Sequence, residues 1–259
     1  MSAGGAGGET RLPDFFRLQR FDEVDSTFTV AKQQAEAGAP AGTLIVARRQ
    51  TAGRGRRGRS FASPEGNLYF SLLLRPTQSA VEAAQLSFVA ALAVADAIRA
   101  VLPAADVRQK WPNDVLLNGG KVCGILLESA ADIADPGQLS WLIAGIGVNV
   151  VSHPEGTDWP AMSLHAAGAT TVDAEAVLRP LAAAFLDWMR RWEADGFAPI
   201  RDAWTRDAVG IGEPITVRLA DKMIDGRFQE LDADGALVLC DENGHARAIT
   251  AGEVFFPAG

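Results

Sequence analysis

One short segment alternates arginine with glycine, a combination suited to holding an anionic ligand. Residues 53–59 read GRGRRGR, so four arginines and three glycines fill seven positions. Glycine permits positive φ angles and lets the backbone come close to a ligand. The arginine guanidinium presents planar donors that match phosphate or carboxylate oxygens. Taken by itself, the segment also fits a nucleic-acid patch or a solvated surface loop.

The overall charge favours a small anionic ligand over a polyanion. The chain has 259 residues with a formal net charge of −8, and 48% of its residues are hydrophobic. An acidic surface repels DNA, RNA and anionic membranes. We therefore expect a local cationic site with neither DNA nor a membrane as partner.

Three further segments combine glycine with polar side chains. They read KWPND at 110–114, GGKVCGIL at 119–126 and GIGVN at 145–149. Each has an ordinary explanation by itself: Trp111 as a core residue, Lys121 as a solvated charge, and Gly145 with Gly147 as a close crossing of strands. Asp25-Ser26-Thr27 reads as the start of a helix. The meaning of these segments depends on their combination.

Hydrophobic periodicity predicts an α+β domain, a mixed β-sheet with helices on one face. The expected strands are 15–24, 43–48, 67–74, 107–111, 114–117, 122–127 and 139–150. The expected helices are 27–37, 83–102, 173–194 and 199–206, and 152–167 is an expected loop.

After residue 210 the pattern changes to short alternating segments. They lie at 215–219, 226–231, 236–240 and 246–249, a spacing typical of a small β-barrel. The predicted organisation is a disordered tail at 1–14, a catalytic domain at 15–209 and a barrel at 210–259.

Composition also bears on the compartment. Residues 1–9 lack the basic and apolar regions of a secretory signal. Asp96 and Arg99 interrupt the apolar run 86–102, so we expect no membrane-spanning segment. Cys123 and Cys240 are far apart and are expected to be reduced thiols. A cytoplasmic protein is predicted.

In their order and spacing, GRGRRGR, KWPND, GGKVCGIL and GIGVN resemble the biotin protein ligases, and the resemblance covers about residues 15–257. It implies the mixed-sheet ligase fold shared with lipoate ligases, followed by an SH3-like barrel. It also implies an enzyme that forms a C–N bond in two steps. ATP and biotin give biotinyl-5′-AMP, and a lysine of a biotin carboxyl carrier protein, or of a carrier domain in a biotin-dependent carboxylase, then takes the biotin.

The resemblance implies a role for each motif residue. Arg56 and Lys121 hold biotin's carboxylate against the α-phosphate, and Asp114 orients the acceptor amine. The implied biotin-binding residues are Ser26, Thr27, Gln50, Gly53, Arg54, Gly55, Arg56, Lys121, Gly124, Leu126, Gly145 and Gly147. The implied ATP- and adenylate-binding residues are Arg54, Arg56, Arg59, Phe61, Lys110, Trp111, Asn113, Lys121, Asn149 and Trp159. Phe28 stands where the family usually has asparagine, which removes an amide at the edge of the ureido pocket.

Further expectations concern metal, partners and regulation. No carboxylate cluster has metal-ligand spacing, so we expect no protein-bound metal, and Mg²⁺ is expected on the oxygens of ATP. About 14 residues precede the first predicted strand, so we expect no DNA-binding repressor domain. Family members include dimers and monomers, so a homodimer is possible. Lipoate or octanoate transfer on the same fold and a non-catalytic nucleic-acid binder are the alternatives.

Overall fold

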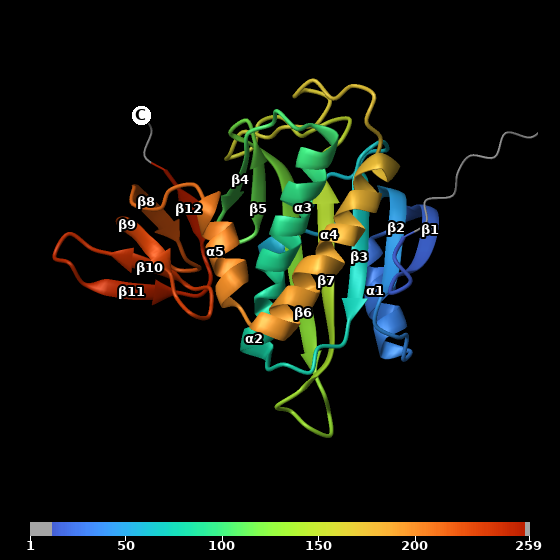
Figure 1. The fold of residues 1–259 in the computed structure, drawn as a ribbon, viewed down its shortest axis with the longest axis horizontal. Coiled ribbons are helices and arrows are strands. Elements are labelled where there is room, and N and C mark those ends of the chain that lie inside the picture. The colour runs from blue at the N-terminus through green and yellow to red at the C-terminus, as the bar shows by residue number, and fades with distance from the viewer. Residues whose placement is uncertain (1–11, 257–259) are drawn as a thin grey trace, which may run out of the picture.

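The computed structural model describes residues 12–256, and a seven-stranded mixed sheet forms its centre (Figure 1). The strands are β1 (Arg17–Val24), β2 (Thr43–Gln50), β3 (Leu68–Leu74), β4 (Val107–Lys110), β5 (Asp114–Leu117), β6 (Gly120–Ala131) and β7 (Leu139–Val148). Their order in space is β1-β2-β3-β7-β6-β5-β4, with β1 and β2 parallel and the other neighbours antiparallel. The predicted mixed sheet is confirmed. Of the predicted tail, residues 1–11 lie outside the described residues; at its end the N–H of Phe16 donates to the carbonyl of Pro13 in a turn.

Two long helices cover one face of the sheet. They are α3 (Leu86–Val101) and α4 (Ala174–Asp195), preceded by the short α2 (Ala80–Ala84) and followed by α5 (Ala198–Arg206). The carboxylate of Asp173 starts α4 by accepting from the N–H of Ala176. Alternate residues of each strand point toward these helices, as Leu44 and Val46 do from β2. The main core therefore lies between the sheet, α3 and α4.

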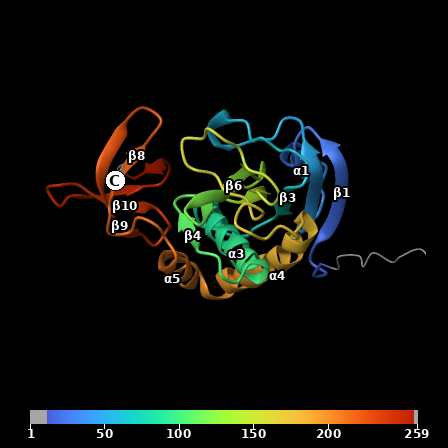
Figure 2. The ribbon, with the colours of Figure 1, turned by 90° about the horizontal axis from the view of Figure 1, so that it is seen from above.

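The helix α1 (Thr27–Glu36) packs on the opposite face, so the expectation of helices on one face is wrong for this helix (Figure 2). Its residues Phe28, Ala31 and Ala35 form a second cluster with Ile45, Leu73, Trp141 and Ile143. The alternation of strand residues lets the same strands serve both cores. Because α1 has only ten residues, it covers part of this face and leaves room for a cavity beside its N-terminus.

The apolar run at residues 80–101 belongs to the core of the protein. Residues 80–101 are long and apolar enough to cross a membrane by length and composition, despite Asp96 and Arg99. However, 72% of their most apolar window is buried inside the protein. A buried core helix can have the length and composition of a membrane span, and here α3 packs mainly against α4.

The C-terminal domain is a five-stranded antiparallel sheet. Its strands are β8 (Pro214–Arg218), β9 (Met223–Leu231), β10 (Leu237–Cys240), β11 (Ala246–Ile249) and β12 (Glu253–Phe255), in the order β11-β10-β9-β8-β12. No pairing of β11 with β12 closes the sheet within residues 12–256, so a closed SH3-like barrel is not confirmed and stays a prediction. The domain lies beside the edge strand β4 (Figure 1), and the indole N–H of Trp111 donates to the carbonyl of Gly235 across the junction.

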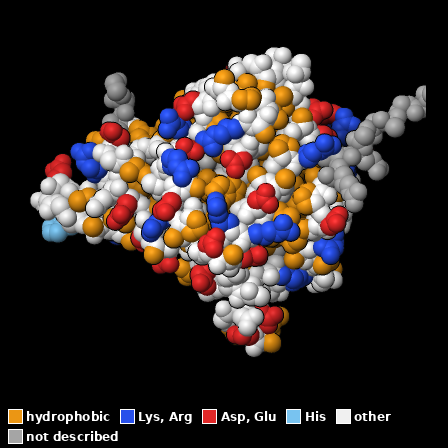
Figure 3. All heavy atoms as spheres, viewed as in Figure 1, with side chains coloured by type: hydrophobic (Ala, Val, Ile, Leu, Met, Phe, Trp, Pro, Cys, Tyr) orange, Lys and Arg blue, Asp and Glu red, His pale blue; other side chains and the backbone are white. Residues whose placement is uncertain are grey.

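Charged side chains are interspersed on the face that α3 and α4 cover (Figure 3). Basic and acidic groups alternate there without forming a continuous basic patch, which agrees with the acidic net charge. This face therefore lacks the electrostatic signature of a nucleic-acid-binding surface.

Candidate active site

A cavity of about 520 Å³ lies on the α1 face of the sheet. Its floor includes Gly124 on β6 and both Gly145 and Gly147 on β7. Gly124 lies directly opposite Gly147 in the paired strands. The arginine loop (residues 51–62), the loop at 152–167 and strand β12 supply the other walls. The predicted residues that line it are Ser26, Thr27, Gln50, Arg54, Gly55, Arg56, Arg59, Phe61, Lys110, Asn113, Asp114, Lys121, Gly124, Leu126, Gly145, Gly147, Asn149 and Trp159.

Two lysines flank a single carboxylate at one end of the cavity. The Nζ of Lys121 lies 2.6 Å from Oδ1 of Asp114, and the Nζ of Lys110 lies 4.0 Å from Oδ2 of the same residue. Burial lowers the pKa of Lys110, and the nearby cation of Lys121 lowers it further, whereas Asp114 opposes the shift. With two cations and one anion, this end of the cavity can attract a further negative group.

The arginine loop begins and ends as a narrow neck. The N–H of Phe61 donates to the carbonyl of Gly53, and the N–H of Gly55 donates to the carbonyl of Arg59. The backbones of Arg54 and Ser60 pair in an isolated antiparallel β-bridge. The short helix η1 (Arg56–Gly58) forms the tip. This fold of the loop sends the side chains of Arg54, Arg56 and Arg59 in different directions.

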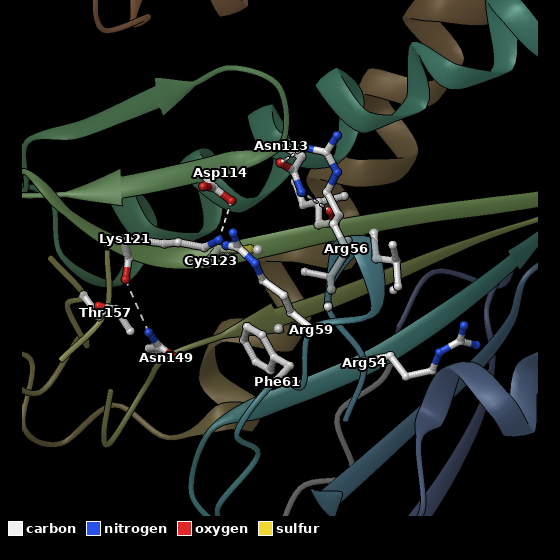
Figure 4. Close-up of a pocket in the computed structure, with 18 of the residues that line it drawn as sticks. Arg54, Arg56, Arg59, Phe61, Asn113, Asp114, Lys121, Cys123, Asn149 and Thr157 are labelled. Atoms are coloured by element: carbon white, nitrogen blue, oxygen red, sulfur yellow. Dashed lines mark hydrogen bonds and ion pairs between the residues drawn. The ribbon is translucent and has the colours of Figure 1, made fainter. Parts of the chain in front are cut away.

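Arg56 points into the site, where its Nη1 donates to Oδ1 of Asn113 at 2.9 Å and to the carbonyl of Gly252 at 3.5 Å. Arg54 points away from the Lys121–Asp114 pair (Figure 4). Its guanidinium lies 5.2 Å from the ring centroid of Phe28 and donates to Glu128. Arg54 thus lies at the opposite end of the cavity from the lysines, which places it nearer the predicted biotin-binding residues than the predicted nucleotide-binding ones.

Arg59 connects the loop to the C-terminal domain. Its Nη1 and Nη2 donate to the two carboxylate oxygens of Glu253, each at 3.1 Å, and Arg218 donates to the same carboxylate at 2.6 Å. Arg218 also contacts Asp158 from the loop at 152–167. Partial burial would raise the pKa of Glu253, but the hydrogen bonds from Arg218 and Arg59 outweigh it and lower the pKa. Four charged side chains therefore join three walls of the cavity.

Two aromatic residues lie where the resemblance places the nucleotide. The ring of Phe61 packs directly on Gly147, because a Cβ at that glycine would lie 2.7 Å from Cε1 of Phe61. The indole N–H of Trp159 donates to the carbonyl of Gly119, and the Nζ of Lys110 lies 4.9 Å from the Trp159 ring centroid. Both rings present apolar surface to the cavity.

The two predicted asparagines act partly as supports. The amide nitrogen of Asn149 donates to the carbonyls of Lys121 and Met162, which ties the loop at 152–167 to strand β6. The amide nitrogen of Asn113 donates to the carbonyl of Ile125, and its oxygen accepts from Arg56. These bonds explain why amides are needed here.

At the other end of the cavity, polar groups surround the start of α1. The side chain of Gln50 accepts from the backbone N–H and hydroxyl of Thr27, and the hydroxyl of Thr27 lies 2.9 Å from that of Ser71. Phe28 is 2% exposed and packs toward Gly145, so the residue that replaces the usual asparagine serves the core beneath this end.

Two predicted site residues lie outside the cavity lining. Trp111 is 2% exposed in the main core, and its indole bonds to Gly235, so its role is to anchor the C-terminal domain. Gly53 lies in the neck, where a Cβ would come within 2.4 Å of the carbonyl oxygen of Phe61. Gly53 is needed for loop closure and its ligand contact stays a prediction, whereas the prediction of ligand contact is corrected for the buried Trp111.

Comparison with known proteins identifies the family. A model of the biotin/lipoate A/B protein ligase family matches residues 20–149, and one of the biotin protein ligase C-terminal domain matches 210–256. The biotin–[acetyl-CoA-carboxylase] ligase of Paracoccus denitrificans is 46% identical over 90% of this chain and 98% of its own length. The chain belongs to the biotin protein ligase family.

Other relatives agree with this ligase assignment. The bifunctional ligase/repressor BirA of Bacillus subtilis is 36% identical over 89% of this chain and 71% of its own length. The biotin protein ligase of Aquifex aeolicus in complex with biotin and ATP superposes with a TM-score of 0.76 at 31% identity, covering 92% of this chain and 97% of that one. The predicted enzyme class and the predicted ligase fold are confirmed.

Several residues of the ligase site were missed from the sequence. Ser71 is a polar residue inside the apolar strand LYFSLLL, and this exception was a usable signal. Arg218 and Glu253 join the site only because the C-terminal domain folds back on the arginine loop, where they meet Asp158 of the loop at 152–167. No local pattern marks such contacts between distant segments.

Proposed function

We propose that this ligase activates biotin with ATP and transfers it to one specific lysine of a biotin carboxyl carrier protein or domain. The observation that carries the proposal is the polarity of the single cavity described above. One end offers a donor at Ser26 and acceptors at Thr27 and Ser71, and the other offers the cations of Arg56, Lys110 and Lys121. A neutral ureido ring suits the first end, and a carboxylate facing a polyphosphate suits the second.

In the first step, an oxygen of biotin's carboxylate attacks the α-phosphorus of ATP, and pyrophosphate leaves. Both reactants are anions, so their repulsion opposes the encounter. Arg56 and Lys121 are placed to neutralise this charge in a partly enclosed site, where electrostatic contacts are stronger than in water. Mg²⁺ is proposed to accompany ATP on its phosphate oxygens, as a partner of the substrate.

In the second step, the acceptor amine attacks the carbonyl carbon of biotinyl-5′-AMP, an amide forms and AMP leaves. The acceptor lysine must lose a proton, and its free pKa is near 10.4. The carboxylate of Asp114 lies at the cavity wall and is 14% exposed, so it can orient the ammonium and accept the proton. The name of the Paracoccus relative supports a carrier of acetyl-CoA carboxylase as acceptor.

The direct test incubates the protein with biotin, ATP, Mg²⁺ and a biotin carboxyl carrier domain, and follows the carrier by mass spectrometry. We expect one biotinyl addition that requires ATP, and none with lipoate in place of biotin. Labelling with lipoate at an equal rate would instead support lipoate transfer. A Lys121→Met variant is the matched control and should lose labelling while it keeps its thermal stability.

The proposal extends to regulation and location. We propose a cytoplasmic ligase without repressor function, supported by the net charge of −8, which disfavours DNA binding. A DNA mobility-shift assay with biotin and ATP present should show no salt-sensitive complex. Homodimer formation stays a prediction, and light scattering with and without biotin measures it.

A further inference from the structure

A buried chain of hydrogen bonds runs behind the cavity, through a residue that does not line it. Ser63 is 6% exposed and stands at the exit of the arginine loop. Its hydroxyl lies 2.8 Å from Nε2 of Gln50 at the loop entrance, and its carbonyl accepts from the Gln50 backbone N–H. Gly53 leaves room for this contact, since a Cβ there would lie 2.5 Å from the Ser63 hydroxyl oxygen.

The backbone of Thr27 fixes the orientation of the Gln50 side chain. The Thr27 N–H can only donate, so the amide atom 2.8 Å from it must be the oxygen of Gln50. The amide nitrogen therefore faces Ser63, whose hydroxyl accepts from it. The Ser63 proton is then free to donate to the carbonyl of Phe61, which lies at 2.9 Å.

The same reasoning gives the direction of the remaining bonds. The hydroxyl of Thr27 has a single proton, which it donates to the Gln50 oxygen at 3.1 Å. The bond of 2.9 Å between Thr27 and Ser71 must then run from Ser71 to Thr27. Protons thus point from Ser71 toward the carbonyl of Phe61 along the whole chain. Both Ser71 and Thr27 line the cavity and keep lone pairs that a ligand can use.

Ser26 presents the opposite polarity beside them. Its hydroxyl oxygen caps α1 by accepting from the N–H of Phe28 at 3.2 Å. Its proton has no hydrogen-bond partner among residues 12–256 and Ser26 lines the cavity, so it can donate to a ligand oxygen. This end of the cavity therefore places a donor, the Ser26 hydroxyl, beside acceptors on Thr27 and Ser71.

We propose that Ser63 is a positioning residue that holds the Gln50 amide in place and so preserves the hydrogen-bond polarity of this end of the cavity. By accepting one amide proton of Gln50, it stabilises the amide in the orientation that the Thr27 N–H imposes, in which Thr27 and Ser71 can accept from a ligand N–H. The ligand class this wall selects is a ring that carries an N–H beside a carbonyl, and it rejects rings with oxygen or an N-methyl at that position. The inference rests on the proposed function, which places the ureido ring of biotin here.

The first experiment measures biotin binding by calorimetry without nucleotide. Ser63→Ala leaves the buried Gln50 N–H without an acceptor, and we expect the Kd for biotin to rise about tenfold. Ser63→Thr keeps the hydroxyl and should recover most of the affinity. The KM for ATP at saturating biotin should stay within about twofold of the wild type, because Ser63 touches no part of the nucleotide end.

Thr43→Val is the matched control. It removes a buried hydroxyl from the other end of β2, where Thr43 donates to the carbonyl of Pro40 at 2.8 Å. We expect this variant to lose thermal stability as Ser63→Ala does, but to bind biotin like the wild type. If Ser63→Ala does not fold, Ser63→Cys carries the same test, because sulfur is a weak acceptor of similar size.

A second measurement distinguishes a change in the hydrogen-bond polarity of the cavity from a general loosening of its walls. The wild type should prefer biotin over its cyclic carbamate analogue, in which one ring N–H is replaced by oxygen, by about 100-fold, and Ser63→Ala should reduce this ratio about tenfold. An unchanged ratio, or unchanged biotin affinity, in Ser63→Ala would overturn the role of Ser63. Failure of the wild type to bind biotin at all would instead overturn the proposed function, and the inference with it.

Discussion

The Nζ of Lys121 and Oδ1 of Asp114 lie 2.6 Å apart on neighbouring strands of the sheet. In this arrangement each charge satisfies the other. An α-phosphate entering the cavity would compete with Asp114 for the lysine, and the displaced carboxylate would then be available to an incoming amine. The pair thus connects the two proposed steps of the reaction.

Replacement of Asp114 should separate those steps. In Asp114→Ala, Lys121 remains available to the phosphate, so we expect pyrophosphate release to fall by less than about threefold. Transfer to the carrier should slow about 100-fold, because the acceptor amine loses its proton acceptor. Single-turnover assays of pyrophosphate release and carrier labelling measure the two steps. Equal losses in both would contradict a role confined to transfer.

Replacement of Arg56 should release the intermediate. Its guanidinium holds both Asn113 and the carbonyl of Gly252, so Arg56→Gly frees the arginine loop from two walls of the cavity. We expect free biotinyl-5′-AMP in solution and labelling of unrelated lysines, measured by mass spectrometry. Arg54→Gly is the control, since Arg54 bonds to Glu128 instead and its loss should keep labelling selective. Retention of the adenylate by Arg56→Gly would refute this role.

The Glu253 cluster predicts a pH dependence of stability. The pKa of Glu253 is lowered in the folded protein, so its contribution is complete above the ordinary glutamate value near 4.5 and is lost as the pH falls through the folded value. We expect Glu253→Gln to lower the Tm at pH 7 and to flatten the fall of the Tm below pH 4.5. Thermal melts from pH 3 to 7 measure both effects. Glu242→Gln, an exposed site in the same domain, should behave like the wild type.

Because Gly147 contacts the ring of Phe61, we expect alanine at Gly147 to reduce activity more than alanine at Gly124. A Cβ at Gly147 would meet the Phe61 ring at 2.7 Å, whereas a Cβ at Gly124 would find its nearest atoms at 3.4 Å or more. Gly147→Ala should therefore lower kcat/KM about tenfold or more, consistent with overpacking costs of about 1–3 kcal/mol.

A double-mutant cycle tests this explanation. Phe61→Leu should relieve the defect of Gly147→Ala and leave Gly124→Ala unaffected, so coupling energy should appear in the first pair alone. Equal coupling of both alanines to Phe61 would show that the cavity, and not the ring, senses the added methyl.

The motifs in the sequence grouped the cavity residues, but the hydrophobic pattern did not predict on which face of the sheet each helix packs. The glycines at 124, 145 and 147 and the cations at 56 and 121 line one cavity, and the sequence could group them because their chemistry is local and occurs in recognisable strings; their ligand contacts stay predictions. The face on which α1 packs was not predicted, since strands buried on both sides show no alternation that distinguishes one face from the other. Trp111 was misplaced for a related reason: the direction of its ring depends on the C-terminal domain, more than 100 residues away.

Strand β12 has a consequence for protein engineering. It supplies Glu253 to the arginine loop, and the adjoining Gly252 contacts Arg56, although both belong to the second domain. The boundary near residue 210 is therefore a poor place to join halves of different homologues. A chimera would assemble a working enzyme only if the donor of the last 50 residues also brought partners matched to Arg56 and Arg59.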